Sequence, residues 1–426
     1  MGRFSRVSSI IAGLLIIPAV LFAQYNNSTS SPFSRYGLGD LQSYSFGRTT
    51  AMGGATLASR YNLQINSANP ASYTAIDSLN FLFEFGLQGN FASYQTNSSS
   101  MKTNDINFNY FAMSFRINSW LASSIGLQPF SDVGYQVLVN GSLDDVGEYQ
   151  TNYYGTGTIS KAYFGLAAMP IPNISVGMNV NYIFGLLNRS TELSFANSGY
   201  YNVQRYSKLR MRDFSFDFGL QAIVPLKDKK EIILAAVFAN QPEYTDFASD
   251  VITKNVIYST AYDQDTLFFN QEEKSKIKFP YTLGGGVSLT KKDVYEINFD
   301  YYHQNWSQAT FFGEPSAFLT DLNKFALGAE WIPDRFSIRS FFNRVSYRAG
   351  LKYQQSYHSF GGHQINDFGI SFGVGLPLYR SASTLNIGAE LGKRGTKDHN
   401  LVLENYAKVN LSVNLHDLWF IQRKID

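Results

Sequence analysis

The stretch Tyr295-Glu296-Ile297-Asn298-Phe299-Asp300-Tyr301 decides the fold class, because apolar and polar side chains alternate along it residue by residue. Successive side chains point to opposite faces of a β-strand, so the stretch predicts a strand with one apolar and one polar face. Leu385 to Gly392 and Phe214 to Gln221 repeat the pattern. Such strands occur in soluble sandwiches and in membrane barrels alike, so strand length and spacing have to decide between the two.

Fourteen segments of this kind follow one another along the chain, and most are 10 to 17 residues long. They are residues 79–94, 105–117, 119–139, 158–169, 173–187, 209–225, 231–242, 276–290, 294–306, 322–332, 345–355, 365–377, 383–393 and 401–415. Sandwich strands typically have about five or six residues, whereas a strand that crosses an outer membrane needs about 9–11. The gaps after even-numbered segments are mostly tight and those after odd-numbered segments are long, with residues 333–344 as the exception. An even strand number and this asymmetry predict an all-β fold, a 14-stranded antiparallel transmembrane β-barrel over residues 79–420.

Composition excludes several other classes of protein. The chain of 426 residues has 35 Phe, 28 Tyr, 4 Trp and no Cys, with 16% charged residues and a formal net charge of +2. Its mean hydropathy of −0.16 argues against a helical membrane protein. The chain lacks the positive charge that nucleic-acid binding needs, and without cysteine it has neither disulfides nor thiol chemistry.

The start of the chain carries the features of an exported protein. Arg3 and Arg6 precede a short apolar run at residues 10–22, so residues 1–23 are typical of a signal peptide cleaved after Ala23. The alternative is a signal anchor, for which the run is short. Cleavage leaves 33 basic and 33 acidic residues. Residues 421–426 are predicted to be a short periplasmic tail, and the localisation predicted is the Gram-negative outer membrane.

Tryptophan positions fit a barrel whose first strand rises from the periplasm. Trp120, Trp331 and Trp419 would then lie at the inner membrane interface and Trp306 at the outer one, as in an aromatic girdle. Charged residues on the polar face of the strands are expected to face the lumen and to pair there. These are Glu84, Arg210, Arg212, Asp217, Glu296, Asp300, Arg348, Lys352, Glu390, Glu404 and Lys408.

Residues 24–78 do not alternate and precede the first strand. They contain Gly47-Arg48, Met52-Gly53-Gly54-Ala55 and Asn69-Pro70-Ala71, in which glycines and small residues permit tight turns and close contact with a wall. Irregular backbone at membrane depth is tolerated only inside protein or in a wet cavity. The segment is therefore expected to hang in the periplasm or to fill the lumen.

These motifs, placed before fourteen strands, resemble the FadL-type outer-membrane transporters of hydrophobic compounds, in the form common among Bacteroidetes. The resemblance implies that residues 24–78 form an N-terminal hatch inside the barrel. Its motif residues here are Gly47, Arg48, Met52, Gly53, Gly54, Asn69, Pro70 and Ala71.

The resemblance also implies two sites on the barrel. In the family a kink in the third strand opens a lateral window, and Gly126, Pro129, Phe130 and Gly134 interrupt the third segment here; the alternative is that Pro129 ends the strand just outside the membrane. The family carries an external capture groove for apolar ligands in the long outer loops. Its candidates in the predicted loop 243–275 are Tyr244, Phe247, Tyr258, Phe268 and Phe269, with a plain solvated loop as the alternative.

No motif predicts catalysis. Gly369-Ile370-Ser371-Phe372-Gly373 matches G-x-S-x-G, but it lies within a predicted strand instead of a strand-to-helix turn. The five histidines show no metal-binding spacing. We therefore predict no enzyme, no cofactor, no catalytic residue and no metal site.

Two functions follow from the sequence. The first is a channel for passive uptake of hydrophobic small molecules, fatty-acid-like or aromatic, gated by the hatch and with lateral exit at the third strand. The second is a non-transporting barrel that serves as a structural or interaction subunit of an outer-membrane assembly or secretion complex. The predicted partners are outer-membrane lipid, a hydrophobic ligand, the barrel-insertion machinery during biogenesis and, for the second function, other outer-membrane proteins.

Overall fold

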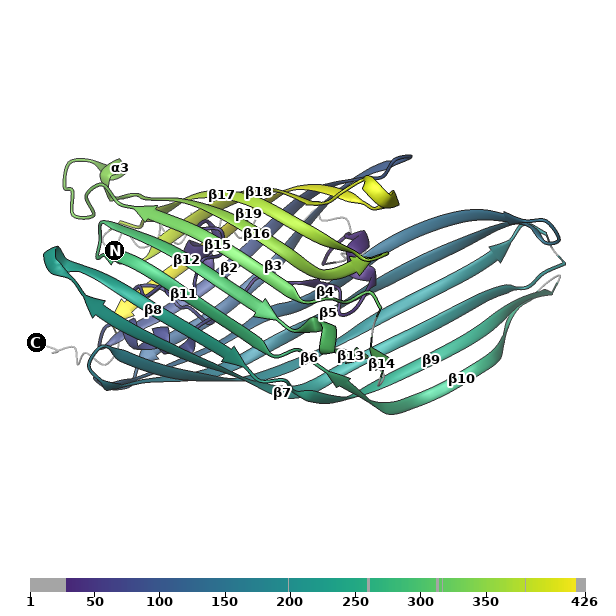
Figure 1. The fold of residues 1–426 in the computed structure, drawn as a ribbon, viewed down its shortest axis with the longest axis horizontal. Helices are drawn as coiled ribbons and strands as arrows, with labels where there is room; N and C mark the ends of the chain where they lie inside the picture. The colour runs from purple at the N-terminus through teal and green to yellow at the C-terminus, as the bar shows by residue number, and fades with distance from the viewer. Residues whose placement is uncertain are drawn as a thin grey trace, which may run out of the picture.

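The structure, a computed structural model, describes residues 28–197, 199–258, 261–311, 314–315, 317–379 and 381–418. The predicted signal peptide, Trp419 and the predicted tail lie outside the described residues. Figure 1 shows long tilted strands that form one tube, with irregular N-terminal chain among them.

The tube is a closed antiparallel barrel of fourteen wall strands, as predicted. β19 pairs with β2 along its whole length and closes the sheet. β8 and β9 follow one another along the chain and both pair with β7, so together they make one wall strand. β10 and β11 also follow one another and pair with β9 and β8, so they make the next wall strand. The strands of the wall are β2 (Asn80–Gln95), β3 (Ser100–Arg116), β4 (Leu121–Leu143), β5 (Gly147–Ile171), β6 (Ile174–Phe195), β7 (Asn202–Pro225), β8 (Lys230–Ala239), β9 (Glu243–Tyr258), β10 (Ala261–Lys278), β11 (Thr282–Lys291), β12 (Tyr295–Gln304), β15 (Leu322–Trp331), β16 (Ser346–Phe360), β17 (His363–Pro377), β18 (Thr384–Gly395) and β19 (Leu403–Leu418).

Short elements occupy the N-terminal segment and the loops. The N-terminal segment contains η1 (Pro32–Arg35), β1 (Asp40–Leu41), α2 (Gly47–Thr50) and η2 (Pro70–Ala75). The loops contain η3 (Lys227–Lys229), η4 (Trp306–Gln308), β13 (Thr310–Phe311), β14 (Glu314–Pro315), α3 (Phe341–Arg344) and η5 (Asp398–Asn400). Among the described residues, no helix is both long enough and apolar enough to cross a membrane.

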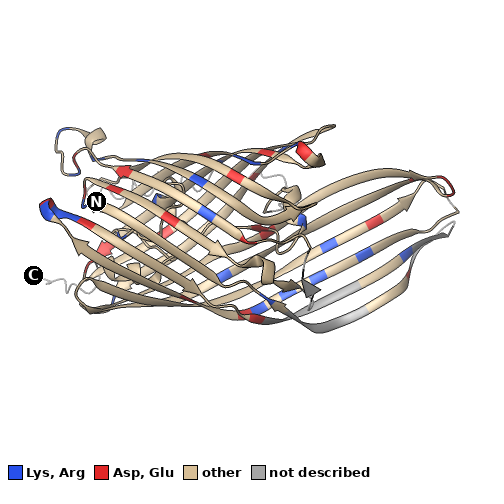
Figure 2. Cartoon of the chain, viewed as in Figure 1, with Lys and Arg blue, Asp and Glu red and all other residues tan. Residues whose placement is uncertain are grey.

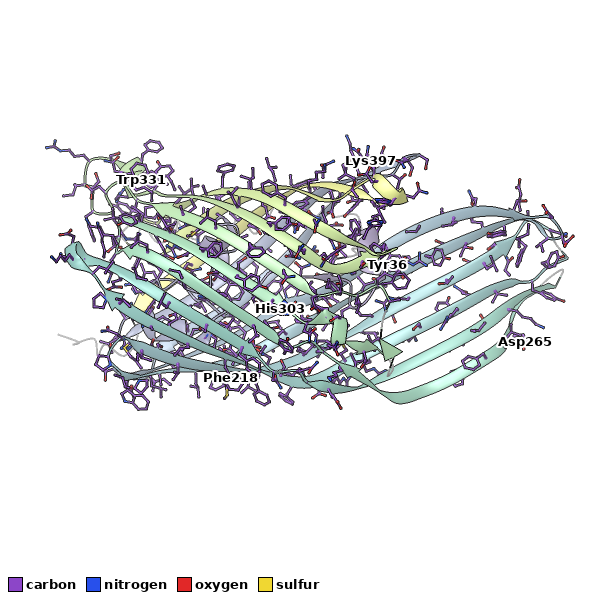
Figure 3. All side chains as sticks on the ribbon, viewed as in Figure 1. Tyr36, Phe218, Asp265, His303, Trp331 and Lys397 are labelled. Carbon is purple, nitrogen blue, oxygen red and sulfur yellow. The ribbon has the colours of Figure 1, made fainter. Side chains whose placement is uncertain are left out.

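Residue alternation along each strand separates an apolar outer face from a polar inner face. In β7, Phe214, Phe216 and Phe218 are exposed on the outside, while Ser215 is buried on the inside. Phe218 projects away from the wall in Figure 3. Exposed aromatic and aliphatic side chains around a closed barrel are the surface that contacts lipid. Trp120 and Trp331 lie on this surface near the end with short turns, here called the inner end.

The predicted loop 243–275 is wrong, because these residues form the β9–β10 hairpin and extend two wall strands outward. β4, β5, β6 and β7 also run past their membrane-crossing parts. Together these strands form a one-sided extension at the outer end, here called the outer wall: residues 133–143, 147–157, 187–195, 202–209, 247–258 and 261–274. It projects to the right in Figure 1.

The predicted positions of three side chains are also wrong. Trp306 is buried instead of lying in an outer girdle, because η4 turns its ring inward. There the ring lies 4.5 Å from the Tyr357 ring, and its Nε1 donates to Gln304 Oε1 at 2.9 Å. Arg210 and Arg212 alternate with buried Leu209 and Met211, so they lie on the outer face of β7 and not in the lumen.

Candidate functional site in the barrel lumen

The N-terminal segment, here residues 28–78, lies inside the barrel and contacts most of its wall. Met52, Ile65 and Tyr73 are completely buried. η2 contacts β3 to β7, and α2 contacts β17, β18 and β19 on the opposite side. The segment therefore spans the lumen from wall to wall.

Arg48 ties the segment to the wall through a buried charge cluster. Its Nε and Nη2 atoms donate to both oxygens of Glu330 at 2.8 Å, and Nη2 also donates to Glu296 at 2.7 Å. Arg348 donates to the same Glu330 at 2.6 Å. Burial alone would lower the pKa of Arg48, but the two carboxylates outweigh it and raise that pKa well above its ordinary value. Such a bidentate pair fixes orientation as well as charge.

Gly53 lets the segment touch the wall backbone. Its φ of +66° is a conformation that residues with a side chain rarely adopt, and its N–H donates to Ser371 Oγ at 2.7 Å. The wall is hollowed opposite, because a Cβ on Gly350 would lie 2.1 Å from the Gly53 nitrogen. Ser371, the centre of the G-x-S-x-G match, thus holds the segment in place.

Asn69-Pro70-Ala71 is seated in a similar way against β6 and β7. The Asn69 side chain accepts from the Ala71 N–H at 3.1 Å and donates to the Leu57 carbonyl at 2.9 Å. A Cβ on Gly219 would lie 2.1 Å from Asn69 Oδ1. Asn69 therefore caps η2, braces the residue-57 turn and contacts the wall.

Replacing Asn69 with alanine is expected to loosen this turn by about 1–2 kcal/mol, the usual cost of losing a capping side chain. Hydrogen exchange should show faster exchange of the Ala71 amide. Asn62→Ala, which removes an exposed bond to Asp77, is the matched control. Equal exchange of the Ala71 amide in the two variants would contradict the capping role.

β4 is irregular at the predicted kink, and its pairing with β3 ends there. A bulge at Phe130 shifts the register between Pro129 and Ser131. β4 pairs with β3 only from Ala122 to Leu127, so residues 100–110 of β3 have no strand pairing with β4. Pro129 does not end the strand, which continues to Leu143.

The N-terminal segment fills this β3–β4 seam. β1 pairs with β4 at Asp132 and Ser131, and Ser34 Oγ accepts from the Gly134 N–H at 3.1 Å. On the other side of the seam, Ser30 donates to Asp105 at 3.0 Å. Gly126 lies below the bulge, where the Tyr163 ring occupies the space of a side chain.

A cavity of about 190 Å³ remains between the segment and the wall. Most of the residues that line it are polar or charged, and its ionisable residues are Asp40, Asp300, Lys324, Lys352, Asp367, Glu390, Arg394, Glu404 and Lys408, besides tyrosines. Lys352 pairs with Glu390 at 2.7 Å and with Asp367 at 3.1 Å. Burial opposes ionisation of Asp40, but Arg394 at 2.9 Å overcomes this and holds the pKa of Asp40 below its ordinary value.

The predicted outer capture residues do not converge on one groove. Phe268 pairs opposite Ile252 and Phe269 opposite Val251, so these neighbouring rings lie on opposite faces of β10. The side chains of Tyr244, Phe247 and Tyr258 lie outside the described residues.

Sequence reasoning missed Glu330 and the wall glycines that receive the segment. Glu330 occupies an inward-facing position in the alternation of β15. This position is the signal in the sequence that identifies it as a lumen residue. Gly219, Gly328 and Gly350 also occupy inward positions, where a missing side chain makes room for the lumen contents.

Comparison of this geometry with solved structures finds FadL-type channels. The toluene transporter TbuX of Ralstonia pickettii matches with a TM-score of 0.61 and 14% identity, over 88% of this chain and 98% of that one. The toluene transporter TodX of P. putida matches with a TM-score of 0.56 and 12% identity, over 89% and 100% of the two chains. A FadL homologue of Pseudomonas aeruginosa matches with a TM-score of 0.54 and 10% identity, over 89% and 98%.

The fold is therefore that of the FadL-type outer-membrane channels. No curated protein matches the sequence. The BamG family model matches residues 6–426, and the chain belongs to the BamG family. The Bacteroidetes-like branch stays a prediction.

Proposed function

We propose that this chain is an interaction subunit of an assembly in the Gram-negative outer membrane, built on a FadL-like barrel. The observation that carries the proposal is the outer wall, whose inner face is partly apolar and is exposed beyond its base. Membership of the BamG family supports it, because that family name points to the barrel-assembly machinery.

The inner face of the outer wall combines aliphatic, aromatic and arginine side chains. Strand pairing places these residues on one face: Tyr135, Val137, Val139, Tyr149, Tyr153, Leu187, Arg189, Leu193, Phe195, Ile252 and Phe268. The N-terminal segment covers the base of this face, where Tyr135 and Leu187 are buried. There Arg35 lies 3.6 Å from the centre of the Tyr153 ring, and Arg189 donates to the Gly37 carbonyl at 2.6 Å. Beyond that point Val139 is 45% exposed and Phe268 is 49% exposed. Tyrosine and arginine around an apolar centre are enriched in protein–protein interfaces.

The charged residues that line the lumen cavity also support the interaction subunit. An apolar solute in the cavity would displace water from buried charges without replacing its hydrogen bonds, which is costly. Pockets for apolar ligands are lined mainly by apolar and aromatic side chains, whereas nine ionisable residues besides tyrosines line this one. The N-terminal segment is held in the lumen by buried ion pairs, and this also favours a barrel whose lumen stays closed.

Passage of hydrophobic small molecules is the second candidate, and one observation favours it. Phe130, Phe279, Trp306 and Tyr357 belong to an apolar cluster at the outer end of the lumen. The resemblance to toluene transporters in fold supports the same reading. In this candidate the N-terminal segment is the gate and the β3–β4 seam is the lateral exit.

The first candidate predicts that a charge on the inner face of the outer wall removes a partner. Val139→Glu should abolish stoichiometric co-purification of outer-membrane proteins from mildly solubilised membranes. Leu138→Glu is the matched control, because Leu138 is 56% exposed on the opposite face of the same strand. Equal recovery of partners in both variants would refute the outer wall as the interface. Loss of aromatic-hydrocarbon or long-chain fatty-acid uptake in a deletion strain, with no co-purifying partner, would favour the second candidate.

A further inference from the structure

The loop between β15 and β16, residues 332–345, is the one long connection at the inner end of the barrel among the described residues. Every other turn described at this end is shorter. In Figure 1 the loop carries α3 and stands clear of the wall. Arg335 at its base lies 5.7 Å from the centre of the Tyr61 ring of the N-terminal segment, whereas the exposed side chains of residues 336–344 are not part of the lumen site or the outer wall.

Internal bonds hold this loop in one shape. The Asp334 N–H donates to the Asn343 carbonyl at 2.8 Å and closes the base of the loop. Ser340 Oγ accepts from the Asn343 N–H and caps α3. Arg335 pairs with Asp293 of the neighbouring turn at 3.3 Å. The loop is thus ordered before it meets any partner.

The ordered loop exposes large apolar side chains beside arginines. Ile338 is 98% exposed, Phe336 78% and Phe342 72%. Arg339 and Arg344 have no acidic partner in the part of the chain that the structure describes, and the one acid of the loop, Asp334, accepts from the Phe336 N–H at 3.1 Å. In Figure 2 the blue positions along this loop are its arginines. Exposed apolar surface of this kind marks a membrane or protein contact.

The position of the loop favours the membrane. The loop begins directly after Trp331 and ends one residue before Ser346-Tyr347 enters the wall as β16. The rings of Trp331 and Tyr347 lie 6.1 Å apart on the lipid-facing side of the wall. Trp331, labelled in Figure 3, lies beside the loop. Lipid-facing Trp and Tyr mark the level of the headgroups, so the loop begins and ends at that level. Its apolar surface continues the surface that already contacts lipid.

We propose that residues 336–344 form an interfacial anchor that inserts Phe336, Ile338 and Phe342 into the periplasmic leaflet, with Arg339 and Arg344 on the phosphates of anionic phospholipids. Apolar side chains at the headgroup–acyl boundary with arginine beside them are the composition of interfacial segments. The anchor fixes the depth of the barrel on the β15–β16 side. It does not depend on which of the two proposed functions holds.

The absence of cysteine allows a direct test on the whole protein. Ile338→Cys, labelled with a polarity-sensitive fluorophore, is reconstituted in vesicles of phosphatidylcholine with or without phosphatidylglycerol. Lys292→Cys, on the neighbouring short turn, is the aqueous control, and Phe372→Cys, on the lipid-facing side of β17, is the membrane control. The label at residue 338 should be quenched by lipid-attached nitroxide and shielded several-fold from aqueous acrylamide relative to residue 292.

The arginines are tested in the same vesicles. Arg339→Gln with Arg344→Gln, in the Ile338→Cys background, should remove the extra shielding that phosphatidylglycerol confers and leave the Phe372→Cys signal unchanged. The proposal is overturned if residue 338 is as open to acrylamide as residue 292. It is equally overturned if residue 338 is shielded only in native outer membranes and not in vesicles, because the loop would then contact a protein.

Discussion

Replacing Arg48 with methionine is expected to release the N-terminal segment from the lumen while the barrel stays closed. The substitution leaves Glu296 and part of Glu330 as buried carboxylates without their cation, since only Arg348 remains on Glu330. Removing one partner of a buried pair typically costs about 3–5 kcal/mol. This free-energy cost weakens the docking of the N-terminal segment and leaves the barrel intact, because the wall strands keep every backbone hydrogen bond between them.

Limited proteolysis of the folded protein in detergent measures this release. The Arg48→Met variant should be cut within residues 28–78, where the wild type should resist cleavage, and single-channel recording should show increased conductance. Heat-modifiable migration in electrophoresis reports that the barrel itself is intact. Lys102→Met, an exposed position on β3, is the control for loss of a cation. A wild-type cleavage pattern in Arg48→Met would show that other contacts hold the segment unaided.

Gly350→Val is expected to displace the same segment by steric conflict instead of by charge. Any Cβ at residue 350 lies 2.1 Å from the Gly53 nitrogen and 2.2 Å from the Met52 carbonyl carbon. Backbone atoms cannot rotate away as a side-chain end does, so the segment has to shift. Overpacking in a well-filled interior costs about 1–3 kcal/mol, and a contact this close places the effect at the upper end.

Gly285→Val supplies a matched control, because the nearest neighbour of its Cβ would be the Ala235 carbonyl oxygen at 3.8 Å, an ordinary contact. Both glycines lie within wall strands, so the substitutions change strand propensity alike. The Gly350→Val variant should expose residues 28–78 to protease and increase conductance, whereas Gly285→Val should behave as wild type. Identical behaviour of the two variants would mean that the segment does not sit against β16 in the membrane.

Several features of the fold can be predicted because they depend only on the local periodicity of the sequence. Strand number and barrel class follow from alternation, since a strand between lipid and a wet lumen must keep opposite polarity on its two faces. Phe214, Phe216 and Phe218 illustrate this outward pattern. The motif around Arg48 was also recognisable, because glycines and small residues cluster there and the strands do not share that composition.

Other features depended on contacts between residues far apart in the chain. The sequence predicts a loop where the β9–β10 hairpin lies, because strands outside the membrane have no lipid face and the alternation that marks a strand weakens. A strand end predicts an interfacial position for Trp306, whereas η4 turns its ring toward Tyr357.

Local periodicity is enough to specify a membrane barrel of fourteen strands preceded by an irregular segment, because the period of two is a property of each strand. The contact of Arg48 with Glu330, 282 residues away, and that of Gly53 with Gly350 arise only in the folded barrel. Which charges pair inside a closed tube depends on strand tilt and register around the whole circumference. That geometry is set when β19 meets β2, and no local stretch of the chain contains it.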